Sequence, residues 1–105
     1  MDITSKDLRE KISNGEKLLI DFYGKFCGPC KVMRPIFDSL SIELKEKNSD
    51  VQMYTFDIED DMDYIVGLGV SKVPTIKGFI NGKEYFTEVG LKDKKSIIEM
   101  VEKLA

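Results

Sequence analysis

Both cysteines of the chain lie in one short stretch, Tyr23 to Lys31, where the hydrophobic pattern changes. Residues 18–23 form an apolar run of strand length, whereas residues 31–47 carry apolar side chains at helical spacing. The pattern therefore predicts that a strand ends and a helix begins at Cys27. The first turn of a helix stabilises anions, so a thiol there ionises more easily than the usual thiol pKa of about 8.5 implies. We expect Cys27 to be the nucleophile and Cys30, one turn further in, to be the resolving thiol.

The Cys-X-X-Cys spacing alone leaves two chemistries open, because such a pair can close a small disulfide or supply half of a tetrahedral metal site. The intervening Gly28 and Pro29 cannot ligate a metal, although they suit a first helical turn and an unhindered approach to Cys27. Two cysteines and no histidine cannot provide four soft ligands within one chain. We expect no metal, since a metal or iron–sulfur cluster would need two chains.

Length and charge limit the remaining classes of protein. A chain of 105 residues is expected to form a single domain, residues 1–105. Its net charge of −3 argues against nucleic acid or an anionic membrane as the main partner, and protein partners are more plausible. No apolar stretch reaches the roughly 18 residues of a membrane span, and the first residues do not resemble a secretory signal. We expect a cytoplasmic monomer.

Hydrophobic periodicity and turn residues predict an alternation of helices and strands. Thr4 is expected to cap a first helix that ends at Asn14-Gly15, and Pro35 is expected to kink the helix that follows the cysteines. The remaining predicted elements are a strand over 51–57, a short helix containing Tyr64, Ile65 and Leu68, a hairpin of 75–80 and 83–89 joined by Asn81-Gly82, and a helix over 93–104 that buries Ile97, Ile98, Val101 and Leu104. This order predicts an α/β fold with a central mixed β-sheet flanked by helices.

A set of motifs in a fixed order adds a family resemblance. The set comprises Asp21, Phe26-Cys27-Gly28-Pro29-Cys30-Lys31, Pro35, Val73-Pro74-Thr75, Asn81-Gly82 and Gly90. Together these motifs resemble those of the thioredoxins, and the resemblance covers almost the whole chain. It implies the thioredoxin fold with its first strand short or missing, since only Asp2-Ile3 remains in that place.

The resemblance implies a function as a protein disulfide reductase that acts by dithiol–disulfide exchange. In this reaction Cys27 attacks a substrate disulfide and Cys30 then releases the reduced substrate. The redox-active disulfide Cys27–Cys30 would be the only redox group, with no separate cofactor. The implied partners are disulfide-containing proteins and a thioredoxin reductase that recharges the pair.

The resemblance also implies roles for residues around the cysteines. Asp21 would be a buried carboxylate that accepts the proton of Cys30. Pro74 would form a cis peptide bond that leaves the backbone of Val73 free to pair with a substrate strand. The residues implied to bind substrate are Phe26, Gly28, Pro29, Val73, Pro74 and Gly90.

Three positions depart from the family pattern. Many thioredoxins pair the buried carboxylate with a lysine, but the matching residue here is Thr55, which leaves Arg34 and Lys77 as candidate cations. Tyr23 and Phe26 stand where thioredoxins usually carry tryptophan. Gly78 interrupts a strand where an apolar residue is usual, and we expect a bulge or a close contact there.

Other functions remain as alternatives. A glutaredoxin usually carries Pro-Tyr between its cysteines, and an oxidase or isomerase usually carries a histidine there, unlike Gly28-Pro29. A thioredoxin-like chain can also serve as a redox-independent binding subunit of a larger assembly. Replacing both cysteines by serine would separate that class from the enzymes.

Overall fold

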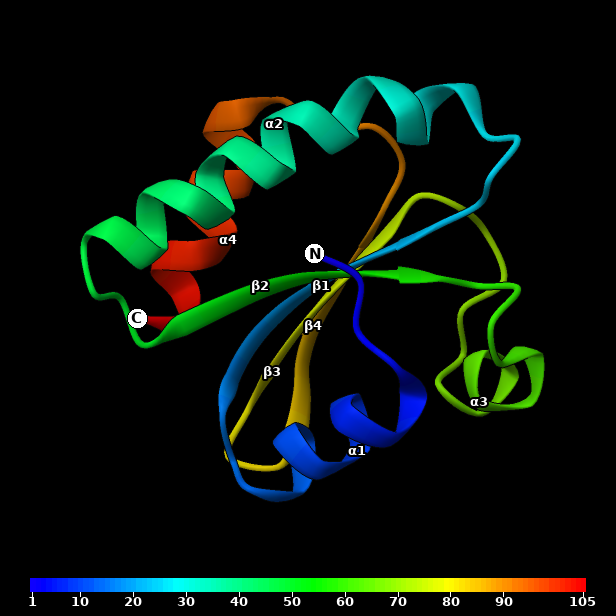
Figure 1. Ribbon diagram of the computed structural model, residues 1–105, viewed down its shortest axis with the longest axis horizontal. Helices are drawn as coiled ribbons and strands as arrows, with labels where there is room; N and C mark the ends of the chain where they lie inside the picture. Colours follow the sequence, from blue (N-terminus) through cyan, green and yellow to red (C-terminus); the bar gives the residue numbers. More distant parts are fainter.

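The computed structural model describes residues 1–105, and its helices and strands alternate as the sequence predicts (Figure 1). The elements are α1 (Ser5–Ser13), β1 (Lys17–Tyr23), α2 (Gly28–Glu46), β2 (Val51–Asp57), α3 (Met62–Gly67), β3 (Thr75–Ile80), β4 (Lys83–Val89) and α4 (Lys94–Leu104). Thr4 caps α1 as predicted, because its side-chain oxygen accepts a hydrogen bond from the backbone N–H of Asp7 at 3.1 Å.

The four strands form one mixed sheet in the order β2-β1-β3-β4. Strand β1 runs parallel to β2 and antiparallel to β3, and β3 pairs with β4 as an antiparallel hairpin. Strand β1 is thus interior, and six of its seven residues are buried. The apolar run before the cysteines is therefore the central strand that its composition predicts.

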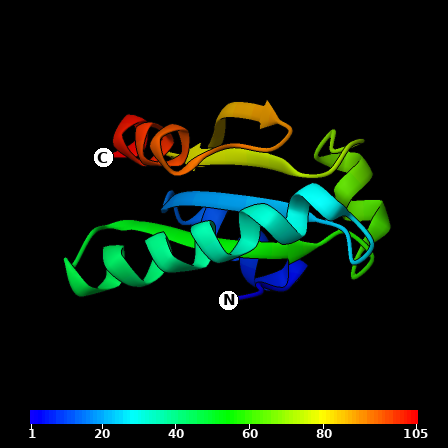
Figure 2. The same cartoon turned by 90° about the horizontal axis from the view of Figure 1, so that it is seen from above.

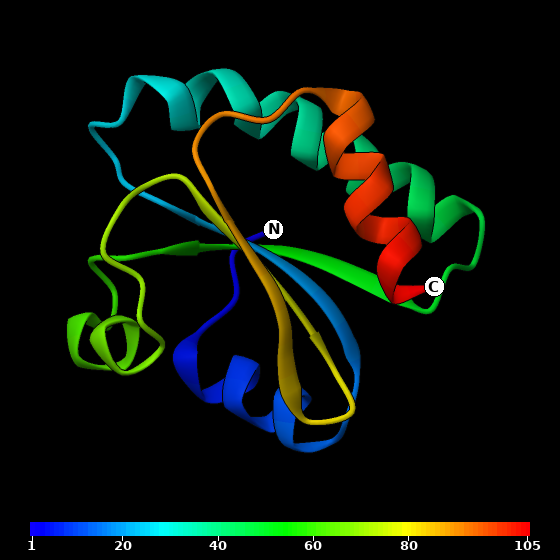
Figure 3. The ribbon, with the colours of Figure 1, turned by 180° about the vertical axis from the view of Figure 1, so that it is seen from behind.

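Helices cover both faces of the sheet. Figures 1 and 3 show α2 and α4 on one face and α1 and α3 on the other, and Figure 2 shows α2 and α4 side by side. The α2/α4 face buries a cluster that comprises Leu19, Met33, Phe37, Leu40, Val51, Met53, Ile76, Ile97, Met100, Val101 and Leu104. The α1/α3 face buries a second cluster that comprises Ile3, Leu8, Leu18, Ile20, Phe22, Phe56, Ile65, Val70 and Phe79.

One predicted core residue is wrong. Ile98 is 38% exposed, and Met100 takes its place in the buried stripe of α4. The helix begins at Lys94 after the cap Asp93, and its inward positions are 97, 100, 101 and 104. Ile98 lies about 60° beyond Val101 at the edge of this stripe, because successive helical residues are about 100° apart.

The expected first strand is reduced to one bridge. Asp2 pairs with Thr55 in parallel, at the outer edge of β2. The N–H of Ile3 donates to the carbonyl of Thr55 at 2.9 Å, and the N–H of Thr55 donates to the carbonyl of Met1 at 3.0 Å. The segment Met1–Ile3 is therefore fixed against the sheet although it forms no strand.

The hairpin also explains Gly78. Asn81 and Gly82 both adopt positive φ angles, of 56° and 82°, as a tight two-residue turn requires. The β3–β4 register shifts between Gly78 and Phe79, and the ring of Phe86 lies directly over Gly78. A Cβ atom at position 78 would lie 2.5 Å from Phe86 Cζ, so the expected bulge and the expected close contact both occur.

Candidate active site

The cysteine pair lies at the junction of β1 and α2. Cys27 is the N-cap residue of α2, and its Sγ accepts a hydrogen bond from the N–H of Cys30 at 3.2 Å. The two cysteines form a disulfide with Cα atoms 5.3 Å apart. Cys30 is only 2% exposed, whereas Cys27 is partly exposed. An incoming disulfide can therefore reach Cys27 and not Cys30.

The surroundings of Cys27 offer an apolar surface. Gly28 and Pro29 are exposed, and Phe26 is exposed over 92% of its surface. Tyr23, the other residue that stands in place of a tryptophan, is buried, and Arg34 of α2 lies over its ring. The exposed apolar side chain beside the disulfide is thus that of Phe26.

The loop before β3 approaches the same place. The Val73–Pro74 peptide bond is cis, as the resemblance implies. A Cβ atom on Gly24 would lie 3.4 Å from Val73 Cγ2 and 3.8 Å from Cys27 Cβ, which places Val73 and Cys27 around this glycine. The N–H of Gly90 donates to the carbonyl of Pro74 at 2.9 Å, while the N–H and carbonyl of Val73 have no partner within the chain.

Asp21 is fully buried on the α2/α4 face of β1, two residues along from Leu19. Neither of its carboxylate oxygens has a hydrogen-bond partner. Burial raises the pKa of Asp21 to about 7, the positive charge of Arg34 lowers this pKa, and the carboxylates of Asp38 and Asp2 raise it. A carboxyl group with such a pKa exchanges protons near neutral pH.

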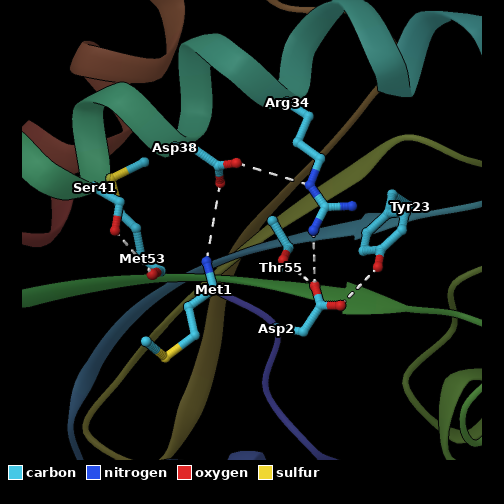
Figure 4. A network of polar contacts seen from close by, with 8 residues as sticks. All are labelled: Met1, Asp2, Tyr23, Arg34, Asp38, Ser41, Met53 and Thr55. Carbon is cyan, nitrogen blue, oxygen red and sulfur yellow. Dashed lines mark hydrogen bonds and ion pairs between the residues drawn. The ribbon is translucent and has the colours of Figure 1, made fainter.

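A polar network joins the N-terminal segment, β1, α2 and β2 (Figure 4). Asp2 is at its centre: Tyr23 Oη donates to Asp2 Oδ2 at 2.8 Å, Arg34 Nη2 donates to Asp2 Oδ1 at 3.3 Å, and Thr55 Oγ1 also donates to Asp2 Oδ1. Arg34 Nε also lies 3.8 Å from Asp38 Oδ2, one turn further along α2. Thr55 is the β2 residue directly opposite Asp21, so the network covers the β2 side of this carboxylate.

The other candidate cation lies elsewhere. Lys77 pairs across the sheet with Ile20, which belongs to the α1/α3 cluster on the opposite face from Asp21. Its Nζ donates to Glu84 Oε1 at 2.5 Å and to Thr87 Oγ1 at 2.9 Å. Lys77 therefore stabilises the hairpin and is not a neighbour of Asp21.

Sequence reasoning did not identify Asp2 as part of the site. Its only signal is its place beside Ile3, which the resemblance assigns to the remnant of the first strand. Pairing that remnant with β2 would have placed Asp2 near Thr55, yet the register is set only in the folded chain.

No group of three or more His, Cys, Asp or Glu side chains is arranged to hold a metal ion. No helix combines the length and the apolar character needed to cross a membrane.

Comparisons with known proteins agree with this site. The family model described as Thioredoxin matches residues 1–103. The thioredoxin of Chlamydia muridarum is 36% identical over 104 residues, which cover 98% of this chain and 97% of that protein. The thioredoxin of Rickettsia typhi is 34% identical over 102 residues, which cover 97% and 92% of the two chains. The X-ray structure of Fasciola hepatica thioredoxin shares the fold, with a TM-score of 0.85 over the whole of both chains at 23% identity.

The sequence match, the mixed sheet flanked by helices and the Cys27–Cys30 disulfide at a helix start all lead to the same conclusion. The activity of the chain is dithiol–disulfide exchange, which makes it a thiol–disulfide oxidoreductase. The chain belongs to the thioredoxin family.

Proposed function

We propose that the chain is a protein disulfide reductase in which Cys27 attacks and Cys30 resolves. The observation that supports this order most directly is the unequal exposure of the two sulfurs at the start of α2. In the first step the Cys27 thiolate forms a bond to one sulfur of a substrate disulfide. The other substrate sulfur leaves with the electron pair and takes up a proton.

In the second step Cys30 loses its proton and attacks Cys27. Asp21 accepts this proton through a water molecule, and its raised pKa suits the transfer. A cavity of about 320 Å³, lined partly by Cys30, Tyr23 and Arg34, provides space for solvent next to Cys30. Attack by the Cys30 thiolate breaks the mixed disulfide, releases the substrate as a thiolate and leaves the Cys27–Cys30 disulfide. Two electrons have then passed to the substrate.

The substrate chain binds along the surface formed by Phe26, Gly28, Pro29, Val73, Pro74 and Gly90. The unpaired N–H and carbonyl of Val73 support this part of the proposal, because they can hydrogen-bond an extended peptide as a further strand would. The exposed ring of Phe26 provides apolar contact beside the disulfide.

A thioredoxin reductase restores the dithiol form, as the membership of the family suggests. The reduction potential of the Cys27–Cys30 couple tests the direction of the reaction. A strongly reducing value, about −270 mV, supports a reductase, whereas a value near that of an oxidant, about −120 mV, means that the chain makes disulfides instead. A cytoplasmic location and a monomeric state stay predictions from the sequence.

The roles of the cysteines are tested by insulin reduction with dithiothreitol as the electron donor. Cys27→Ser should abolish turnover, while Cys30→Ser should stop at a mixed disulfide on Cys27, which mass spectrometry detects. Full activity of Cys27→Ser would exclude the assignment. If a chain with both cysteines replaced by serine still performs its role in the cell, the redox-independent binding subunit is the better reading.

A further inference from the structure

Charge compensation for Asp21 differs here from the lysine pairing that the family resemblance implies. The β2 residue opposite Asp21 is Thr55, which carries no charge and whose hydroxyl donates to Asp2. Lys77, the only lysine in β3, lies on the other face of the sheet. The cation near Asp21 is Arg34, which lies one turn beyond Cys30 on α2.

Three contacts hold the Arg34 guanidinium in place. Its carbon lies 4.4 Å from the centre of the Tyr23 ring, Nη2 binds Asp2 at 3.3 Å, and Nε lies 3.8 Å from Asp38. Tyr23 is itself fixed by its hydrogen bond to Asp2 at 2.8 Å. A planar guanidinium suits this combination of ring stacking, one hydrogen bond and a second carboxylate better than an ammonium does.

We propose that Arg34 is a positioning residue for the resolving step: held by Asp2, Asp38 and Tyr23, it places the positive charge that stabilises the ionised, proton-accepting form of Asp21. This inference rests on the proposed role of Asp21 as the proton acceptor. The Cys30 proton moves to the Asp21 carboxylate, and Arg34 makes the ionised carboxylate available at neutral pH without itself exchanging a proton.

The charged groups around Asp21 set the sign of each expected change. Arg34 and Asp38 face it from α2, Asp2 faces it from the N-terminal segment, and the amino group of Met1 lies 3.9 Å from Asp38. Strand β2 contributes the neutral Thr55, and β1 itself contributes the hydroxyl of Tyr23. Arg34 is thus the cation that contacts both carboxylates, whereas the amino group of Met1 contacts Asp38 alone.

The first test is the titration of Asp21 by ¹³C NMR of its carboxyl carbon, with the signal assigned from an Asp21→Asn spectrum. Arg34→Met should raise the pKa of Asp21 by roughly one unit, because the nearby positive charge is lost. Asp2→Asn should lower it, because a carboxylate is lost while the amide can still hold Arg34. If Arg34 merely packs α2 on the sheet, its removal admits water and lowers the pKa toward that of an exposed carboxyl group. A fall or an unchanged value in Arg34→Met would therefore overturn the proposal.

Two further variants separate charge from packing. Arg34→Lys keeps the charge, so the pKa of Asp21 should stay close to its wild-type value. An Asp21 pKa in Arg34→Lys equal to that in Arg34→Met would overturn the charge argument. Lys45→Met removes one positive charge from an exposed position on the same helix and should leave Asp21 unchanged. If Lys45→Met raised the pKa of Asp21 as much as Arg34→Met does, the net charge of the protein, and not Arg34, would control this pKa.

Insulin reduction gives the kinetic readout. A pKa shift from about 7 to about 8 lowers the ionised fraction of Asp21 at pH 7 from about one half to about one tenth, so the rate of a limiting resolving step falls roughly five-fold. The ratio of wild-type to Arg34→Met rates should approach one above about pH 9, and a ratio independent of pH would count against the proposal. The NMR titration needs no turnover, so it can refute the role of Arg34 even if the chain reduces insulin. A shifted titration in an inactive wild-type protein would refute the reductase proposal alone.

Discussion

Replacing Asp21 by asparagine should make the stability of the protein less dependent on pH. The carboxyl group has a pKa of about 7 in the folded protein, against 3.8 as its ordinary value. The folded chain therefore holds this proton more tightly than the unfolded chain. Its contribution to stability is complete below about pH 4 and is lost as the pH rises to about 7.

The size of this effect follows from the shift in pKa. A difference of about three units, at about 1.4 kcal/mol per unit, corresponds to about 4 kcal/mol of free energy of unfolding. Asparagine is nearly isosteric with the protonated carboxyl group and does not ionise. Asp21→Asn should thus raise the free energy of unfolding by close to zero at pH 4 and by about 4 kcal/mol at pH 8.

Urea unfolding of the oxidised proteins measures this difference. Circular dichroism at 222 nm is the suitable signal, because the chain contains no tryptophan. Asp60→Asn makes the same substitution in an exposed turn and should leave the pH dependence unchanged. The reasoning is refuted if the difference in free energy of unfolding between the wild type and Asp21→Asn stays constant from pH 4 to pH 8.

Three further predictions concern other residues. Gly78→Ala should lower the free energy of unfolding, measured in urea, by about 1–3 kcal/mol, because the new Cβ would overlap the Phe86 ring. Adding Phe86→Leu should recover part of this loss, and additive effects of the two substitutions would contradict the contact. Phe26→Ala should lower kcat/KM for insulin roughly ten-fold, because apolar contact with the substrate is lost. The rate of reduction of a small aromatic disulfide should stay unchanged, and an equal loss of rate with both substrates would indicate a damaged cysteine pair. Lys77→Met should leave the NMR titration of Asp21 unchanged, since Lys77 lies on the other face of the sheet, and a shift would contradict that placement.

Local chemistry explains which parts of the fold the sequence predicts. Asn81-Gly82 predicts the hairpin because both residues tolerate the positive φ angles that a two-residue turn needs. Thr4 similarly predicts a helix start, since its side chain accepts an N–H group three residues later. Ile98 is misplaced because apolar residues at 97, 98, 100 and 101 fit two helical stripes equally well, and only packing against the sheet selects one.

In the candidate site, too, the sequence predicts the residues of local motifs and not the contacts between distant segments. Cys27 and Cys30 are predicted by short-range pattern, and the family resemblance points to Asp21 and Pro74. The surroundings of Asp21 are not predicted, because they depend on contacts such as Asp2 with Thr55, 53 positions apart in the chain. The sequence could only leave Arg34 and Lys77 as equal candidates, and the strand pairing that separates them exists only in the folded sheet.

The segment Met1–Ile3 has a consequence for the state of association of the protein. Strand β2 is an edge strand, and such an edge can recruit a strand from another molecule. Here Met1 and Ile3 occupy the N–H and carbonyl of Thr55, and Ser49 accepts the N–H of Val51. Ser41 of α2 donates to the carbonyl of Met53 (Figure 4). Met1 and Ile3 thus cover both outward groups of Thr55, and the two serines cover one group each of Met53 and Val51. A chain that lacks Met1–Ile3 would expose the N–H and carbonyl of Thr55, and it should self-associate through this edge more readily than the full chain.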